Sequence, residues 1–300
     1  MANYVTELFQ YSFAFNGFVF GGDGSPYQIL TVDGLEDLPV IRNQDDNRGY
    51  QDGMWTGRDF LSGRTILMTM IIRGDVNNSM SQNFDKMQAA LQPQQQGVGL
   101  LQFQLPNQQL QEIGARVRRR SVQINTDYSS GMATATYEFF CPDPRYYDNF
   151  IQNTNLVLGA TTAGRTYNRV YTGAAQPGAN PYSTGMIYGG GSTSANLINN
   201  AGWTTTYPVI TITGPATNPI VTDVSNGYFL KIDTVLLPTD TLVINTNYRT
   251  ITLNGVNRRA LLNNLSTWFA APPGTSYYTF AATGTGTGTS CVVTWQNAYI

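Results

Sequence analysis

The sequence predicts an all-β protein of two domains, with one helix packed on the first domain. Three observations lead to this prediction. Short runs alternate apolar and polar residues and end at turn residues, as half-buried strands do. The 300 residues include 30 glycines and 14 prolines, and only 12% are charged, against about 25% in typical soluble domains. Charge density also falls near residue 150, from net −5 in residues 1–150 to net +3 in residues 151–300.

The composition excludes several classes of function. The chain contains no histidine, which removes Ser-His-Asp catalysis and histidine metal ligands. A net charge of −2 argues against a generally basic nucleic-acid-binding protein. Residues 1–7 lack the basic and apolar regions of a signal peptide, and no stretch reaches the ~20 apolar residues of a membrane span. We therefore expect a chain that is made in a cytoplasm and does not insert into a membrane.

Aromatic residues predict the first hairpin. Phe9, Tyr11, Phe13 and Phe15 alternate with smaller residues, and the turn signal Asn16-Gly17 follows. Asn-Gly favours a two-residue turn because both residues tolerate positive φ. This turn would place Phe15 opposite Phe18 and Phe13 opposite Phe20 on one face of the hairpin.

Three further strands and one helix complete the predicted first domain. The same alternation predicts strands near residues 66–72, 101–105 and 133–139. Ser79 and Gln82 form a capping box, in which each side chain satisfies the other residue's backbone N–H. The apolar residues that follow at helical spacing predict a helix packed on the sheet; they are Met80, Phe84, Met87 and Leu91.

The second half of the chain predicts a β-sandwich. Alternation is lost between about 146 and 206, where residues 173–178 and 189–194 resemble linkers. Short strands then recur near 209–213, 220–224, 228–232, 241–244, 250–253, 277–280 and 292–295. Turns every eight to twelve residues are typical of sandwiches. The Gly-Thr run at 283–289 is expected to be a flexible hairpin loop. The predicted domains are 1–147 and 206–300, joined by a linker or extended arm over 148–205.

Few residues suggest chemistry. Glycosidic hydrolysis needs two carboxylates beside one bond, and the second domain offers only Asp223, Asp233 and Asp240, which we expect to be turn residues. The run from Asp45 to Gly49 suggests a calcium loop, but Thr56 stands where the closing glutamate is needed. Cys141 and Cys291 are expected to be buried thiols without a base, although a disulfide in an oxidising compartment is the alternative. No catalytic, cofactor-binding or metal-binding residue is predicted.

Arginines form the sharpest charged feature. Arg116, Arg118 and Arg120 would share one face of a strand. A nucleic-acid patch and a plain exposed strand are two interpretations. The third is an inter-subunit ion-pair strip, because repeated subunits align such strips. Its acidic partners would be Asp45, Asp46 and Asp52, or Glu36 and Asp37.

Aromatic residues of the second domain allow two interpretations. Trp268, Trp295, Tyr277 and Tyr278 could form a sugar-stacking platform on the surface. They could equally fill the core of the sandwich, which is the more common role of such rings.

Four stretches carry a resemblance to a known family. They are residues 30–35 with 53–72, residues 141–147 (Cys-Pro-Asp-Pro-Arg-Tyr-Tyr), residues 199–202 with 207–215, and residues 240–244 with 250–255 and 295–299. In this order and spacing, they resemble the distal tail proteins of long-tailed, non-contractile, siphovirus-like bacteriophages. The likeness covers nearly the whole chain and is strongest in 27–147 and 199–300.

The resemblance implies a structural virion protein rather than an enzyme. It implies an N-terminal ring domain of β-sandwich or split-barrel type and a C-terminal galectin-like β-sandwich. Such rings are usually hexameric and lie in the baseplate at the tail tip. The implied partners are the tail tube protein, the tail hub or tail-associated protein, the tape measure protein and receptor-binding proteins, while viral DNA passes through the bore without specific binding. The alternatives are a carbohydrate-binding adhesin of the virion and a glycan hydrolase. Galectin-type sugar sites use a histidine, so the fold alone does not imply sugar binding.

Overall fold

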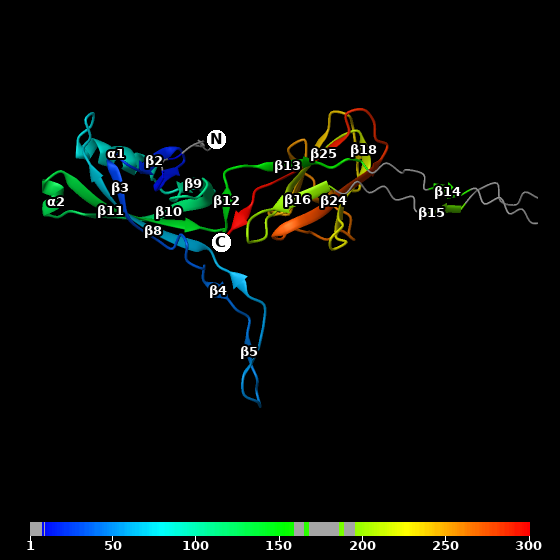
Figure 1. The fold of residues 1–300 in the computed structure, drawn as a ribbon, viewed down its shortest axis with the longest axis horizontal. Helices are drawn as coiled ribbons and strands as arrows, with labels where there is room; N and C mark the ends of the chain where they lie inside the picture. Colours follow the sequence, from blue (N-terminus) through cyan, green and yellow to red (C-terminus); the bar gives the residue numbers. More distant parts are fainter. Residues whose placement is uncertain (1–7, 9, 159–164, 168–185, 189–195) are drawn as a thin grey trace, which may run out of the picture. The chain divides into compact units, whose positions relative to one another are not determined.

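The computed structural model describes residues 8, 10–158, 165–167, 186–188 and 196–300, and these residues are almost entirely β (Figure 1). They form two compact units. The first unit comprises Met1–Ile151, Ala201–Thr204 and Gln296–Ile300, and the second comprises Gln152–Asn200 and Thr205–Trp295. The predicted linker glycines 173–178 and 189–191 lie outside the described residues. The division into ring domain, arm and outer domain stays a prediction.

A nine-stranded antiparallel sheet forms the first unit. Its main path runs β2 (Phe18–Gly21), β1 (Ser12–Phe15), β9 (Gly99–Gln104), β10 (Gln111–Gln123), β11 (Met132–Cys141), β8 (Arg64–Arg73) and β3 (Tyr27–Asp33). The short strand β12 (Tyr146–Asp148) pairs with β10 and with β26 (Ala298–Tyr299). The helices are α1 (Met80–Ala90) and the single turn α2 (Thr126–Ser129). The prediction of an all-β domain with one packed helix is thus confirmed.

The first predicted hairpin forms as expected. Phe13 pairs with Phe20 and Phe15 with Phe18 across the turn. Asn16 (φ 49°) and Gly17 (φ 88°) both adopt the left-handed conformation that this turn requires. The rings of Phe13 and Phe20 stack with their centroids 6.1 Å apart.

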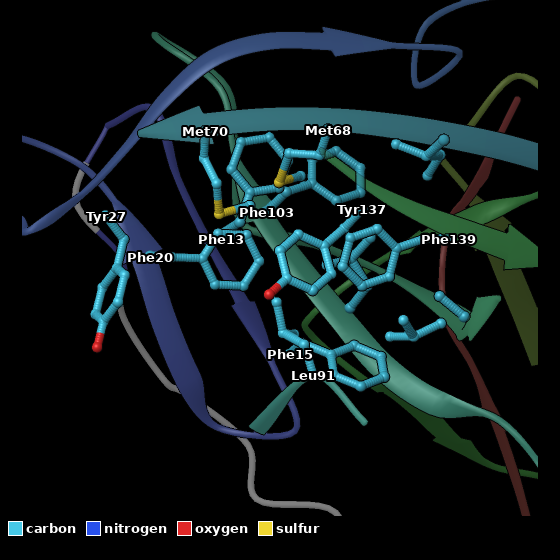
Figure 2. Packing of buried hydrophobic residues seen from close by; sticks show 14 of the residues in the cluster. Phe13, Phe15, Phe20, Tyr27, Met68, Met70, Leu91, Phe103, Tyr137 and Phe139 are labelled. Atoms are coloured by element: carbon cyan, nitrogen blue, oxygen red, sulfur yellow. The ribbon is translucent and has the colours of Figure 1, made fainter. Parts of the chain in front are cut away.

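The core of the first unit is built by strand alternation. Every second residue of β8 and of β11 is fully buried, and Figure 2 shows Met68, Met70, Tyr137 and Phe139 converging with aromatic rings of β1 and β9. The sheet folds over this core, because Phe15 of β1 contacts Phe139 of β11 with ring centroids 5.5 Å apart. The end strands β2 and β3 do not pair, so the described sheet does not close into a barrel.

Helix α1 covers this core through one face. Ser79 and Gln82 form the predicted capping box. Met87 and Leu91 are buried, whereas Met80 and Phe84 are partly buried at the margin of the core. The helix is therefore structural, as the sequence predicted.

A long hairpin extension, residues 36–63, is inserted between β3 and β8. Within it, β4 (Ile41–Arg42) pairs with β7 (Phe60–Leu61), and β5 (Asp46–Asn47) pairs with β6 (Met54–Trp55). Figure 1 shows β4 and β5 extending away from the sheet. Every residue from 40 to 60 except Arg48 is exposed. The predicted solvated loop at 45–49 is therefore part of a projecting two-stranded element.

The second unit is a two-sheet sandwich. One sheet contains β13 (Gln152–Asn155), β25 (Ser290–Trp295), β17 (Val209–Thr213), β21 (Thr241–Asn245), β22 (Thr250–Leu253) and β23 (Val256–Asn257). The other contains β16 (Asn196–Asn200), β24 (Gly274–Thr283), β18 (Ala216–Asp223) and β19 (Phe229–Lys231), with β20 (Val235–Leu236) on β18. Inward residues of both sheets share one core. A 3₁₀ turn η1 (Arg259–Leu261) and a separate pair of β14 (Arg165–Tyr167) and β15 (Met186–Tyr188) are also described.

The Gly-Thr run does not form the predicted hairpin loop. It connects β24 to β25, which lie in different sheets of the sandwich. The Thr289 hydroxyl donates to the carbonyl oxygen of Pro215 at 2.6 Å, and the Thr283 hydroxyl donates to that of Thr217 at 3.3 Å. The run therefore connects the two sheets, and these two hydrogen bonds hold it to the start of β18. It is not a hairpin loop, because β24 and β25 do not pair with each other.

The C-terminal residues belong to the first unit. Asn297 Nδ2 donates to the Asp148 carboxylate, and Gln296 Nε2 donates to Glu112 Oε1, each at 2.7 Å. Tyr299 stacks on Tyr146 with ring centroids 5.8 Å apart. A fragment that ends near residue 147 would lose these contacts. No helix in the described part of the chain is long and apolar enough to cross a membrane.

Candidate functional site

A β-bulge changes the predicted arginine face. Val117 pairs with Phe139, but the next paired residue is Arg119, opposite Glu138, so Arg118 is the extra residue of the bulge. After the bulge the alternation is displaced by one residue, and Arg120 stands opposite the core residue Tyr137. Arg116, Arg118 and Arg120 therefore do not form one regular face, and that prediction is wrong.

The arginines nevertheless make a basic end to β10. Arg116 is half-buried and its Nη2 donates to the carbonyl oxygen of Gln94 at 3.0 Å. The guanidinium carbon of Arg118 lies 3.4 Å from the ring centroid of Phe140. Arg118, Arg119 and Arg120 are all exposed. Three consecutive exposed cations are a stronger basic feature than the alternating set that the sequence suggested.

The predicted acidic partners lie on the hairpin extension. Asp45 is structural, because its Oδ1 accepts the Gly57 N–H at 2.9 Å and its Oδ2 accepts Asn43 Nδ2 at 3.0 Å. Asp46 pairs with Trp55 in the β5–β6 ladder, and Asp52 lies near the turn between those strands. The extension holds six acidic residues and three arginines, so it is acidic where the end of β10 is basic.

Aromatic and cationic side chains line the extension. Arg48 lies over the Trp55 ring, 4.5 Å from its centroid, and Arg58 lies 5.3 Å from the centroid of Phe60. Trp55 is 63% exposed, and Tyr50 is fully exposed. Tryptophan, tyrosine and arginine are the residues that dominate binding energy at protein interfaces. The extension therefore presents a surface that its own subunit leaves uncovered.

Neither charged group forms an ion pair among the described residues of the subunit. Among the described residues, the ion pairs are Arg145–Asp143 and Lys231–Asp233, at 3.3 and 3.2 Å. Neither pair involves the extension or the basic end of β10. The structure thus does not bring the candidate arginines and acids together, and it leaves both available to a second molecule.

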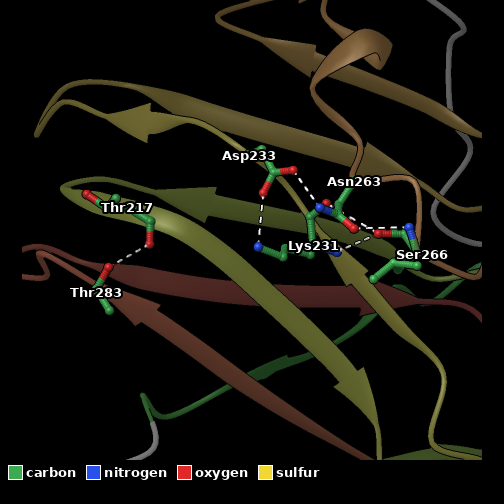
Figure 3. Close-up of polar contacts among 7 residues, drawn as sticks. Thr217, Lys231, Asp233, Asn263, Ser266 and Thr283 are labelled. Atoms are coloured by element: carbon green, nitrogen blue, oxygen red, sulfur yellow. Dashed lines mark hydrogen bonds and ion pairs between the residues drawn. The ribbon is translucent and has the colours of Figure 1, made fainter.

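Carboxylates of the second unit hold turns, as predicted. Asp223 accepts the Ser225 N–H at 2.9 Å and Asn226 Nδ2 at 2.8 Å. Figure 3 shows Asp233 between Lys231 and Asn263. The hydrogen bond from Asn263 lowers the pKa of Asp233, and the one from Asn254 lowers the pKa of Asp240. Local donors stabilise Asp233 and Asp240 as anions, and Asp223 holds its turn through two hydrogen bonds, which suits structural roles.

The four aromatic candidates do not form a sugar platform. Tyr278 and Trp295 are buried in the sandwich core, and Trp268 packs against it partly buried. Tyr277 alone of the four is exposed, at 45%. The interpretation as core aromatics is confirmed for three residues, and stacking on a sugar ring would have one tyrosine to use.

The cysteines are buried free thiols. Burial raises the pKa of Cys141 to about 12 and also raises the pKa of Cys291. Both stay protonated near neutral pH and are poor nucleophiles. Within the described residues, no group of three or more cysteine, aspartate or glutamate side chains could hold a metal ion.

Sequence reasoning missed Arg119 and the aromatic residues of the extension. Strict alternation would place Arg119 on the other face of the strand from Arg118 and Arg120, and one inserted residue changes that assignment. Trp55 and Tyr50 lie among glycines and acidic residues, so this part of the sequence resembles a loop. The separation of Asp46 from Trp55 by a turn with Gly49 and Gly53 was the signal of a hairpin.

Comparison with known proteins gives a family match in the C-terminal third. Residues 201–299 match the family model described as siphovirus-type tail component, C-terminal domain. No curated protein matches the chain in sequence.

Solved structures resemble the chain over nearly its full length. The structure of SPP1 Dit, described as a paradigm of the hub adsorption apparatus in phages that infect Gram-positive hosts, matches with a TM-score of 0.62 and 16% identity, covering 96% of this chain and 99% of that one. A chain of the phage P2 baseplate, in its activated conformation with Ca, matches with a TM-score of 0.47 and 12% identity, covering 92% of each chain.

The fold and the family match agree with the resemblance found in the sequence. The family model matches only the C-terminal third of the chain, whereas the structural likeness to SPP1 Dit covers both units. The predicted resemblance to siphovirus distal tail proteins is therefore confirmed: residues 201–299 match the siphovirus-type tail component model, and the chain as a whole has a fold similar to that of SPP1 Dit.

Proposed function

We propose that this chain is a structural protein of a siphovirus-like tail tip, and that its first unit assembles with copies of itself into a closed ring. A hexamer is the stoichiometry that the family resemblance implies. The observation that carries the proposal is that one subunit presents two exposed surfaces of opposite charge. One is the acidic hairpin extension, and the other is the basic end of β10.

Physical chemistry favours an interface at the extension. Ordering a projecting hairpin costs conformational entropy, about 1–2 kcal/mol per residue, and the extension buries almost none of its own side chains in return. Such an element is stabilised when a partner covers it. Because the extension and the basic end of β10 are different surfaces of one chain, their contact would be heterologous, and such contacts form a ring when the rotation between subunits closes.

Charge would set the register of this contact. The acidic residues Asp46 and Asp52 of one subunit would face Arg118 and Arg119 of the next. Arg48 and Trp55 would lie between them as an apolar and cationic anchor. The ring would join the tail tube protein to the tail hub, with the tape measure protein, receptor-binding proteins and passing DNA as further neighbours, and the second unit would serve as a docking module without catalysis.

Sedimentation velocity of the full-length chain tests this proposal. The chain should form a closed oligomer at low salt, and Arg118→Glu with Arg119→Glu should weaken it by at least about tenfold in dissociation constant, given the usual strength of close interface charge pairs. Arg73→Glu is the control, since Arg73 is an exposed arginine at the far end of β8. Restoring complementarity with Asp46→Arg and Asp52→Arg should recover assembly.

Two outcomes would contradict the proposal. One is a chain that stays monomeric at high concentration and low salt. The other is an oligomer that the paired arginine changes weaken no more than Arg73→Glu does. The salt dependence gives an independent check, because screening should weaken wild-type assembly, whereas in the Arg118→Glu, Arg119→Glu variant it should relieve the repulsion between like charges.

A further inference from the structure

One buried arginine closes the root of the hairpin extension. Arg64 is 2% exposed and directly follows the extension, while Gly34 and Leu35 directly precede it. Arg64 Nη1 donates to the carbonyl oxygens of Gly34, at 3.1 Å, and of Leu35. Its Nε donates to the carbonyl oxygen of Pro144 at 3.1 Å. One guanidinium therefore joins both ends of the extension to the segment that leads into β12.

Two glycines show how closely the root is packed. A Cβ added to Gly34, whose φ is +82°, would lie 2.2 Å from the carbonyl oxygen of Thr65. A Cβ added to Gly63 would lie 2.7 Å from the ring of Phe140 and 2.9 Å from the carbonyl oxygen of Cys141. All three distances are too short for a real side chain, so the close approach of the two ends of the extension depends on glycine at both positions.

Arg64 is hydrogen-bonded through Nε and Nη1, whereas its Nη2 is buried without a hydrogen-bond partner. A buried cation normally needs a carboxylate partner, yet its described hydrogen bonds go to three carbonyl oxygens. Burial lowers the pKa of Arg64, and the nearby carboxylates of Glu36 and Asp37 at the start of the extension oppose that change. The planar fork of arginine holds its donors in fixed directions toward acceptors in separate segments, whereas lysine carries one compact ammonium on a flexible stem.

We propose that Arg64 is a positioning residue that holds the hairpin extension in a fixed direction from the sheet, so that the extension is preorganised for the next subunit. The part that concerns the next subunit rests on the proposed function. Preorganisation matters because an extension that swings freely loses that freedom on binding, which weakens association.

Hydrogen exchange of Arg64→Lys tests the positioning role directly. The measurement uses monomeric chain, obtained by dilution or in the Arg118→Glu, Arg119→Glu background. Protection of the extension amides, such as the Ser62 N–H that donates to the Val40 carbonyl oxygen, should fall by about tenfold, while amides of β8 and β11 keep their protection. Arg73→Lys, the same change at an exposed arginine of β8, should alter neither set.

The opposite pattern would overturn the proposal. If Arg64→Lys leaves the extension as protected as in the wild type, Arg64 does not position it. If protection falls equally in the extension and in β11, Arg64 is a general stabilising residue of the core and not a positioning residue.

A second measurement needs no change at Arg64. Spin labels at Tyr50→Cys and Gln123→Cys place one probe on the extension and one on the exposed end of β10, and the native cysteines are buried. Monomeric chain should give a single narrow distance distribution, and a broad one would refute a fixed direction. If the direction is fixed but deletion of residues 40–60 leaves the oligomeric state unchanged, the positioning role stands and the proposed ring contact fails.

Discussion

The sheet body of the first unit and its hairpin extension use similar residues in opposite ways. In β8 and β11, every second side chain is buried, and the core includes Met, Phe and Tyr. In the extension, the same residue types are exposed, including Met54, Phe60 and Tyr50. The body buries its apolar surface within one chain, whereas the extension leaves its apolar surface exposed. Residue type alone therefore does not separate the core of a subunit from its exposed surface.

The largest effect should come from one substitution made in both regions. Phe103 is fully buried in the core of the first unit (Figure 2). Its ring centroid lies 6.1 Å from that of Phe13 and 5.7 Å from that of Tyr146. Phe103→Ala should lower the unfolding free energy of the first unit by about 3–5 kcal/mol. Phe60→Ala in the extension should change it by less than ~0.5 kcal/mol. Hydrogen exchange of β8 and β11 amides measures the first unit separately from the second.

The outcome separates the two regions cleanly. A loss of stability of similar size in both variants would show that the extension packs on its own subunit in solution. The comparison between body and extension would then be wrong.

Helix α1 lies at the margin between buried and exposed, and it offers the second test. Met87 is fully buried, so Met87→Ala should cost about 2–5 kcal/mol. Phe84 is only partly buried, so Phe84→Ala should cost less, although phenylalanine is the larger residue. Equal or reversed losses in thermal unfolding would mean that the helix packs more deeply at Phe84 than the structure shows.

Local features of the body were predictable from the sequence. The Asn16-Gly17 turn, the capping box at Ser79 and the alternation in residues 66–72 each depend on a few neighbouring residues. The turn depends on positive φ, the capping box on unsatisfied backbone N–H groups, and the strand on burial of every second residue. Each of these causes acts between residues of a single short segment.

The features that the sequence did not reveal depend on residues far apart in the chain. The bulge at Arg118 is set by the register of β10 on β11, which alternation within β10 does not encode. The Gly-Thr run crosses between sheets because β24 and β25 pair with different strands. In the sequence, Arg64 resembles an ordinary strand residue. Its role depends on hydrogen bonds to Gly34 and Pro144, which lie far from it in the chain. The candidate site was therefore predicted in its charges but not in its geometry.

Glu112 supplies a pH-dependent test of the body. Burial raises the pKa of Glu112, and the hydrogen bond from Gln296 opposes that rise in part. The folded state thus holds the proton more tightly than the unfolded state. This contribution to stability is fully present below the unfolded pKa, near 4.5, and is lost as pH rises through the folded pKa.

The expected result is a flatter pH profile in the variant. Glu112→Gln removes the titration, so the unfolding free energy of the first unit should vary less with pH above about 4.5 than in the wild type. Glu138→Gln, in β11, controls for the amide substitution itself. An unchanged slope in Glu112→Gln would show that Glu112 is hydrated in solution.

The smallest effect on stability should accompany the sharpest effect on association. Trp55 is 63% exposed and stacks only against Arg48 in its own subunit, so Trp55→Ala should change the unfolding free energy by less than ~0.5 kcal/mol. If the extension meets a neighbouring subunit, the same change should weaken assembly by ~2 kcal/mol or more, as loss of a tryptophan hot spot does.

Trp203→Ala is the matched control, because Trp203 is similarly exposed, at 62%, but lies in the first unit outside the extension. Calorimetry and sedimentation on the same samples give both quantities. A variant that assembles normally would remove the extension from the interface, whereas one that unfolds early would make Trp55 a core residue. A folded variant that fails to assemble is what an apolar surface reserved for another molecule predicts.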